Sequence, residues 1–261
     1  MLRRLIVNAD DFGFTRDVNE GIVSCHREGI LTSTTLMATG LAFRHAVELA
    51  KANPSLDIGC HLVLVQGLGL PADVPALIQA ILLRQINLLT VLRGQLEIVF
   101  KAGIRPTHLD THKHTHLIPA VLDAVLRVSE EYGIRHIRKP ADFHRDRSAP
   151  LATQAISACM GIALHSFDGK LERAHAQRTD HFTGFQLTGR MTPQNLAATL
   201  AALPEGTTEL MCHPGLLGGE LPLANTRLKQ SRVDEWRALR SPLARHALNE
   251  RGIQLITYRE L

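Results

Sequence analysis

The stretch LIVNADDFG at residues 5–13 shows the unit from which the fold is built. Its branched apolar residues, Leu5 to Val7, favour a buried strand, and the polar residues and glycine after them end that strand. The following residues, Thr15–Glu28, repeat apolar positions at helical spacing. A buried strand that leads through a polar turn into an amphipathic helix is one βα unit, and such units build parallel sheets.

The same alternation continues along the 261-residue chain, without a Ser/Gly-rich linker, so we predict one domain over residues 1–261. Seven or eight βα units favour an α/β fold with a single (β/α) barrel, incomplete or distorted, over an open doubly wound sheet. The predicted strands are Arg4–Ala9, Ser33–Ala38, Ile58–Leu64, Thr107–Asp110, His136–Arg138, His165–Phe167 or His181–Phe185, Thr208–Cys212 and Gln254–Tyr258. The predicted helices are Thr15–Glu28, Ala42–Ala52, Val74–Ala102, Pro119–Tyr132, Thr192–Ala202 and Arg232–Asn249, and loops with short elements are expected over Ala141–Gly189.

Composition excludes several classes of protein. A chain that is 45% hydrophobic and 21% charged is neither disordered nor collagen-like. The net charge of +4 is scattered, and the chain has one Trp and two Tyr, so no basic surface with stacking partners for nucleic acid is indicated. The excess of histidine, 14 residues, is the feature that calls for an explanation.

Cysteine spacing and apolar windows bear on location. The four cysteines are far apart and form no CxxC pair, which is typical of reduced cytoplasmic thiols. The N-terminus lacks the apolar core of a signal peptide, and polar residues interrupt the most apolar window, Val74–Leu92. We therefore expect a cytoplasmic protein without a membrane span.

Adjacent acids, Asp10 and Asp11, follow the first predicted strand. At the carboxyl end of a parallel strand they would point to different sides, so that one binds a metal ion and the other contacts a water beside it. The alternative is a helix N-cap, with Asp11 or Thr15 opening the next helix.

Histidines gather at two further strand ends. His61 lies in a predicted strand, where a lone histidine is more often structural. The run PTHLDTHKHTHLIP at 106–119 supplies further candidate ligands, since an extended backbone would point five side chains to one face. These five are His108, Asp110, His112, His114 and His116. Imidazole and carboxylate are ligands of Zn²⁺, Mn²⁺, Fe²⁺ and Ni²⁺, and carboxylate also suits Mg²⁺, so the run could form a metal site. The alternatives to a metal site are an exposed His-rich loop, or a strand and capped helix in which some histidines orient others.

The remaining candidates lie towards the C-terminus. His213, in ELMCHPG at 209–215, precedes a forced turn, which leaves its ring at the rim as a general acid or base or as a structural residue. Arg138 ends a predicted strand, either at the rim of the site or in solvent. Arg232 and Glu235 are expected to be partners on a helix surface.

Taken in order, the motifs resemble those of the YdjC-like carbohydrate deacetylases, which include chitooligosaccharide deacetylases and a branch associated with hopanoid biosynthesis. The segments that carry the resemblance are LIVNADDFG at 5–13, NEGI at 19–22, GILTSTTLM at 29–37, GCHLVL at 59–64, PTHLDTHKHTHLIP at 106–119 and ELMCHPG at 209–215. The resemblance implies an incomplete barrel, a divalent metal ion usually taken as Mg²⁺, with Zn²⁺ or another transition metal as alternatives, and a homodimer.

The resemblance also implies roles for single residues. Asp11, His61 and His112 correspond to metal ligands, Asp10 to the general base and His213 to the general acid. The residues expected to support the ligands or face the substrate are His108, Asp110, His114, His116 and Arg138.

The reaction that the resemblance implies is hydrolysis of an N-acetyl group on an amino sugar or chitooligosaccharide-like substrate. A site with three protein ligands is consistent with this reaction, because it leaves room for a water and a carbonyl. The alternatives are hydrolysis of another bond at the same site (a hopanoid-linked acetyl sugar, another amide or a phosphoester) and metal or sugar binding without catalysis. After Gly67 the chain enters an apolar helix quickly, where many relatives carry a longer polar loop, so the wall of the sugar site is expected to be short.

Overall fold

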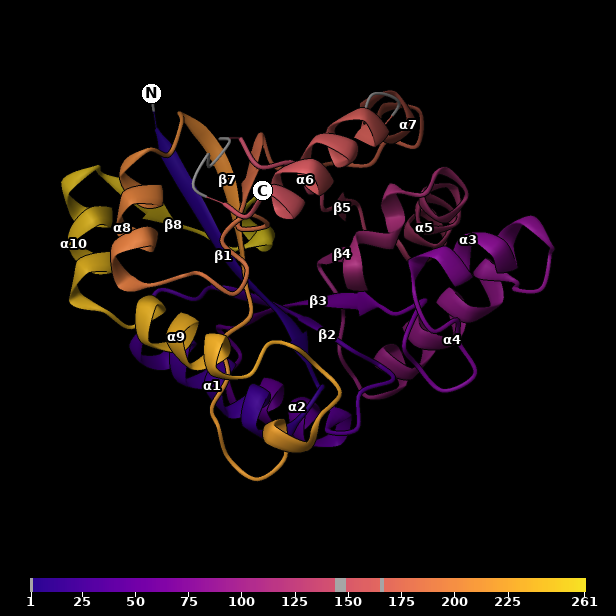
Figure 1. The fold of residues 1–261 in the computed structure, drawn as a ribbon, viewed down its shortest axis with the longest axis horizontal. Helices are drawn as coiled ribbons and strands as arrows, with labels where there is room; N and C mark the ends of the chain where they lie inside the picture. The colour runs from indigo at the N-terminus through magenta and orange to yellow at the C-terminus, as the bar shows by residue number, and fades with distance from the viewer. Residues whose placement is uncertain (1, 144–148, 165–166) are drawn as a thin grey trace.

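The computed structural model describes residues 2–143, 149–164 and 167–261. Its strands form one parallel sheet that curls into an incomplete barrel at the centre of the molecule (Figure 1). The order across the sheet is β5 (His136–Ile137), β4 (His108–Thr111), β3 (Asp57–Leu62), β2 (Ser33–Leu36), β1 (Arg3–Phe12), β7 (Gly206–Cys212) and β6 (His181–Thr183), and β8 (Ile253–Leu255) pairs with the start of β1. The predicted fold class is confirmed; of the two candidate positions for the weak strand, the sheet uses the one at residue 181, and the other lies partly outside the described residues.

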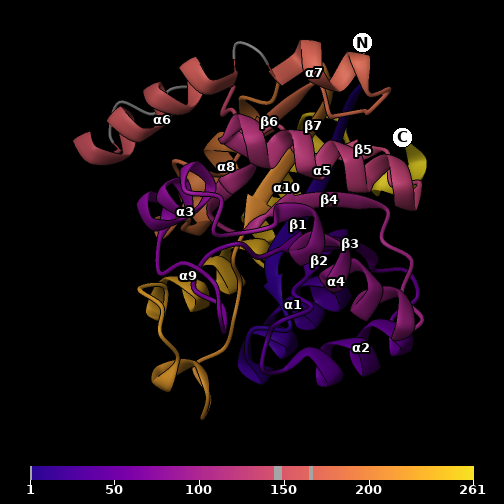
Figure 2. The same ribbon diagram turned by 90° about the vertical axis from the view of Figure 1, so that its right-hand side faces the viewer.

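The helices surround the strands (Figure 1). They are α1 (Arg16–Glu28), α2 (Phe43–Ala52), α3 (Val74–Leu82), α4 (Leu88–Lys101), α5 (Pro119–Tyr132), α6 (Leu151–Ala163), α7 (Phe167–Arg173), α8 (Pro193–Ala201), α9 (Gln230–Leu239) and α10 (Pro242–Glu250). The 13-residue α6 is longer than the short elements expected in that region, and it lies at the edge of the molecule (Figure 2). In the described parts of the chain, no helix has both the length and the apolar character to cross a membrane.

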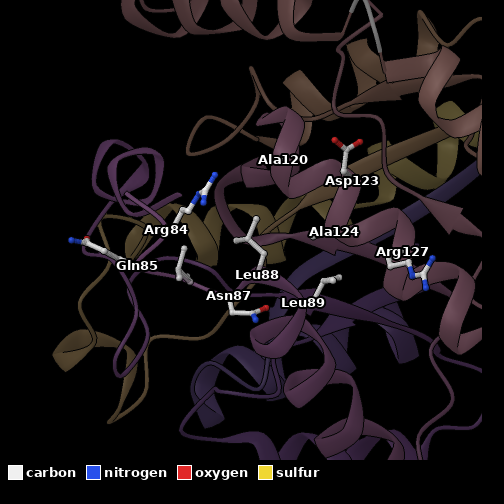
Figure 3. A pocket seen from close by; sticks show the side chains of 10 residues that line it. Arg84, Gln85, Asn87, Leu88, Leu89, Ala120, Asp123, Ala124 and Arg127 are labelled. Carbon is white, nitrogen blue, oxygen red and sulfur yellow. The ribbon is translucent and has the colours of Figure 1, made fainter. Parts of the chain in front are cut away.

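The prediction of one helix over Val74–Ala102 is wrong. The chain leaves the helix at Leu83, Arg84 adopts a positive φ of 54°, and Asn87 begins α4 by accepting the N–H of Thr90. This turn and α5 border an open groove of about 700 Å³ (Figure 3). Its lining includes apolar Leu88 and none of the residues to which the sequence assigns chemistry.

The prediction of one helix over Arg232–Asn249 is also wrong. Ser241 and Pro242 divide it, since the Ser241 hydroxyl caps α10 and a proline is favoured at the first helical position. The break matters for the site because it makes α9 a separate short helix that packs against α1.

The two edges of the sheet approach one another. The Phe143 N–H donates to the carbonyl oxygen of Phe182 in β6, and Asp142 forms an isolated bridge with the same residue. Parallel strands that curl in this way bring their carboxyl ends together at one mouth. Functional side chains from separate βα units therefore meet there.

Candidate metal centre and active site

A β-bulge near the end of β1 places both adjacent acids in the site. Pairing with β2 runs from Ala9 opposite Thr34 to Phe12 opposite Leu36, so β1 carries one extra residue. Asp11 takes up this residue with a φ of 69°, a left-handed conformation that aspartate tolerates. The expectation that the two acids point to different sides is wrong, because the bulge cancels the alternation of an ideal strand.

Three donor atoms from β1, β3 and the end of β4 form a triangle. Asp11 Oδ1 lies 3.5 Å from His61 Nε2 and 3.4 Å from His112 Nδ1. The two imidazole nitrogens are 3.4 Å apart. Asp11 and His61 are buried and His112 is half-buried, so the triangle is open on one side.

The triangle has the size that a metal ion requires. A point equidistant from atoms with these separations lies about 2.0–2.2 Å from each, which is the length of Zn–N, Zn–O and Mg–O bonds. One carboxylate and two imidazoles are also a donor set for divalent ions. The three residues, which the resemblance implies as ligands, therefore have donor atoms and separations that could hold a metal ion.

Asp110 orients the imidazole of His61. Its Oδ1 lies 2.7 Å from His61 Nδ1, and its Oδ2 accepts the Thr35 hydroxyl at 3.0 Å. With Nδ1–H held by the carboxylate, the lone pair of Nε2 points into the triangle. Burial would lower the pKa of His61, but Asp110 and the neighbouring acids outweigh it and raise that pKa to about 9, which shows that the surroundings favour positive charge.

The run of alternating polar residues does not remain extended. β4 ends at Thr111, and a 3₁₀ turn (His112–Leu117) follows in which Lys113 and His114 have positive φ. The prediction that all five side chains share one face is wrong. His112 joins the triangle, whereas His114 turns aside to contact the rings of Phe182 and Phe185.

His108 and His116 make contacts that support the fold below the site. His108 accepts from or donates to Asn8 and Thr107 and stacks on Tyr258 with ring centroids 3.7 Å apart. Its ring fills the space beside Gly59, where a Cβ would lie only 2.5 Å away. His116 lies between the Thr111 hydroxyl and the Arg138 carbonyl oxygen. Both rings therefore contact groups of the surrounding fold, and neither is a donor of the triangle.

Arg138 is fully buried at the centre of three carboxylates. It binds both oxygens of Asp10 at 2.7 Å, and it also bonds to Asp110 at 2.7 Å and to Glu209 at 2.6 Å. Asp10, His61 and Asp110 also have donors close enough for a second ion, but the guanidinium occupies the position between the two acids. Burial would raise the pKa of Asp10, but Arg138 and two histidines hold it well below its usual range.

Glu209 contacts Arg138 in the site, although the sequence analysis did not assign it a role. Glu209 and His213 are four residues apart at the end of β7, and strand alternation alone would place them on one face. His213 Nε2 lies 3.9 Å from Asp10 Oδ2, and its Nδ1 has no hydrogen-bond partner among the described residues. Burial outweighs the attraction of Asp10 and lowers the pKa of His213 to about 4, so the ring is neutral at neutral pH.

Arg232 and Glu235 are buried, and their prediction as helix-surface partners is wrong. Arg232 donates to Asp11 Oδ2 at 2.5 Å, while Glu235 accepts the backbone N–H of His213. Their i, i+3 spacing indicates one helix face, but only the packing of α9 on the site shows that this face points inward. Burial raises the pKa of Glu235 to about 7.

Negative groups outnumber positive groups in the buried cluster. The acids are Asp10, Asp11, Asp110, Glu209 and Glu235, and the guanidiniums are those of Arg138 and Arg232. Excess buried negative charge is costly unless a cation or protons neutralise it. The open triangle beside this cluster is therefore suited to a divalent cation.

Comparison with known proteins extends these observations. A model of the family described as "YdjC-like protein" matches residues 4–250. A carbohydrate deacetylase of Brevibacillus brevis is 35% identical, covering 99% of each chain, and a chitooligosaccharide deacetylase of Klebsiella pneumoniae is 30% identical, covering 100% of each. A crystal structure of a protein from Enterococcus faecalis V583 superposes with a TM-score of 0.77 at 27% identity, covering 100% of this chain and 99% of the other.

Proposed function

The chain belongs to the YdjC-like protein family, and from this premise we propose that it is a metal-dependent hydrolase that removes N-acetyl groups from an acetylated carbohydrate. The observation that carries the proposal is the triangle of Asp11, His61 and His112 with Asp10 and His213 beside it. Relatives named carbohydrate deacetylase and chitooligosaccharide deacetylase support the substrate class, an amino sugar or its oligomer.

The triangle would hold the ion. When bound, a divalent cation supplies Lewis acidity that polarises a carbonyl and lowers the pKa of a bound water. The resemblance to the family favours Mg²⁺, whereas two imidazole donors also suit Zn²⁺ or another transition metal. His112 leaves one side of the triangle accessible, which gives the substrate a route of approach.

Asp10 is assigned the role of general base. Its carboxylate is ionised, and Arg138 holds both oxygens so that the group cannot rotate away from the mouth of the barrel. Fixed orientation of a base relative to the attacking water reduces the entropic part of the barrier. The bidentate contact also explains why Asp10 is not itself one of the triangle's donors.

His213 is assigned the role of general acid. Because its ring is neutral at neutral pH, it must receive a proton before it can protonate the departing amine. Asp10 Oδ2 lies 3.9 Å from Nε2, so a small movement of the His213 ring would let Asp10 pass on the proton that it takes from water. Glu235 holds the backbone N–H of His213 and so fixes the ring at the rim.

The test is acetate release from N-acetylglucosamine oligomers by the purified protein and by Asp10→Asn. We expect Asp10→Asn to lower kcat by about 10²–10⁴-fold, because a general base contributes about that much, while bound metal measured by elemental analysis is unchanged. Asp123→Asn, which alters an exposed carboxylate paired with Lys170, serves as the matched control and should keep full activity.

Other outcomes separate the alternatives. Cleavage of a different ester or amide with no acetate from any acetylated sugar would contradict deacetylation while keeping the metal site. Wild-type function in Asp10→Asn would instead indicate a binding protein. The homodimer, the cytoplasmic location and the single domain remain predictions, to be checked by light scattering, fractionation and limited proteolysis.

A further inference from the structure

Arg232 holds the oxygen of Asp11 that the triangle does not use. Asp11 Oδ1 faces His61 and His112, whereas Oδ2 accepts from Arg232 Nη2 at 2.5 Å. The Arg232 side chain is 2% exposed, so little water competes for this bond. The two oxygens of a single carboxylate thus have separate partners.

The position of Arg232 is over-determined by its surroundings. Its Nε donates to the Leu228 carbonyl oxygen at 3.3 Å, and its Nη1 lies 3.5 Å from the carbonyl oxygen of His213. The Arg232 carbonyl oxygen accepts the N–H of Gly215, and the arginine stem fills the space beside that glycine. The guanidinium therefore cannot follow Asp11 if the carboxylate rotates.

We propose that Arg232 is a positioning residue that limits Asp11 to one coordinating oxygen and so makes the triangle selective for small divalent ions over Ca²⁺. The inference rests on the metal site of the proposed function. Zn²⁺ takes four donors, and Mg²⁺ takes six but keeps several of its waters, so both form short bonds to few protein donors. Ca²⁺ takes six to eight oxygens at longer distances and accepts both oxygens of one carboxylate. Because Arg232 binds Asp11 Oδ2, this oxygen is not available as the extra donor that a larger ion would use.

Charge and geometry predict different results when Arg232 is replaced. Loss of a positive charge beside the site strengthens binding of every divalent cation by the same electrostatic effect. Release of Oδ2 adds a donor that favours Ca²⁺ alone. The ratio of the two dissociation constants therefore reports geometry, because the effect of charge cancels.

The experiment measures Mg²⁺ and Ca²⁺ binding separately by titration calorimetry on the metal-stripped full chain. Arg232→Met keeps the packed stem and removes the fork of donors. We expect the Kd ratio to shift towards Ca²⁺ by about tenfold relative to the wild type, or about 1.4 kcal/mol. Arg237→Met, an exposed residue of the same helix paired with Asp234, is the matched control and should leave the ratio unchanged.

Each result decides the matter. If both affinities rise together in Arg232→Met and the ratio stays within twofold of the wild type, Arg232 acts only through charge and the inference is wrong. If circular dichroism shows that Arg232→Met is unfolded, Arg232→Gln, which is too short to hold Oδ2, is measured with the same expectation. Wild-type protein that binds neither these ions nor Zn²⁺ would overturn the metal site itself, which is a separate failure.

Discussion

The two sides of the site are built in different ways. On one side, Asp11, His61 and His112 come from β1, β3 and the end of β4, and their three donor atoms face the mouth of the barrel. On the other side, Arg138 follows β5 and Arg232 lies in α9, far apart in the sequence, and both side chains are buried. We call the first set the ligand triangle and the two arginines the arginine pair.

The comparison shows a division of tasks. The ligand triangle presents nitrogen and oxygen atoms that could bind a metal ion. The arginine pair instead forms ion pairs with carboxylate oxygens, which would otherwise be free to rotate or to bind other groups. We therefore expect metal binding to depend on the first set and the orientation of both acids on β1 to depend on the second. Substitutions in the two regions should therefore fail in different ways.

The largest effect is expected from the arginine pair. Arg138→Met leaves Asp10, Asp110 and Glu209 buried without their cation, and removing one partner of a buried ion pair costs about 3–5 kcal/mol. We expect a free energy of unfolding lowered by that amount in urea titrations, together with loss of measurable acetate release. Arg93→Met, which breaks an exposed pair with Glu131, should change it by less than about 1 kcal/mol. If both variants lowered the free energy of unfolding equally, the buried arginine would stabilise the fold no more than an exposed one, which would contradict this prediction.

An intermediate effect is expected behind the ligand triangle. Asp110→Asn keeps the shape of the side chain but removes the charge that orients His61. Loss of such a supporting carboxylate weakens metal binding by about 10–100-fold. Zn²⁺ titration calorimetry checks this value, with circular dichroism to establish that the variant is folded. An unchanged Zn²⁺ affinity would mean that packing alone, without the Asp110 charge, fixes the orientation of the His61 ring.

The smallest effect is expected at Glu235, which supports His213. Because burial raises the pKa of Glu235 to about 7, the folded state binds a proton more tightly than the unfolded chain, whose glutamate has a pKa of 4.5. Its contribution to stability is present below pH 4.5 and is lost as the pH rises to about 7. The groups that face it are Arg232, His213 and Asp10.

Glu235→Gln should flatten this part of the pH dependence. The glutamine oxygen still accepts the His213 N–H, so activity at the optimum should fall only a few-fold. Urea titrations between pH 5 and 7.5 compare the two proteins. A wild-type stability that rises across this interval relative to Glu235→Gln would show that the sign is wrong.

Local sequence was sufficient for the parts of the site that lie on strands. Asp10 and Asp11 follow an apolar run, so their place at the mouth could be predicted without coordinates, and His61 could be placed within a strand. The repeated βα units likewise predicted the curled parallel sheet. The division of two helices was missed although Ser241-Pro242 marked one break, because apolar periodicity continues across it.

The sequence by itself determined the fold class and the residue types available for a metal site, since periodicity and strand-end position are properties of neighbouring residues. Tertiary structure alone decided which of them meet. The bulge at Asp11 turns two adjacent acids into one site, the turn at Lys113 separates His112 from His114, and α9 buries Arg232. The physical reason is that each of these outcomes depends on free energies of burial and pairing between segments tens to hundreds of residues apart, which local patterns do not encode.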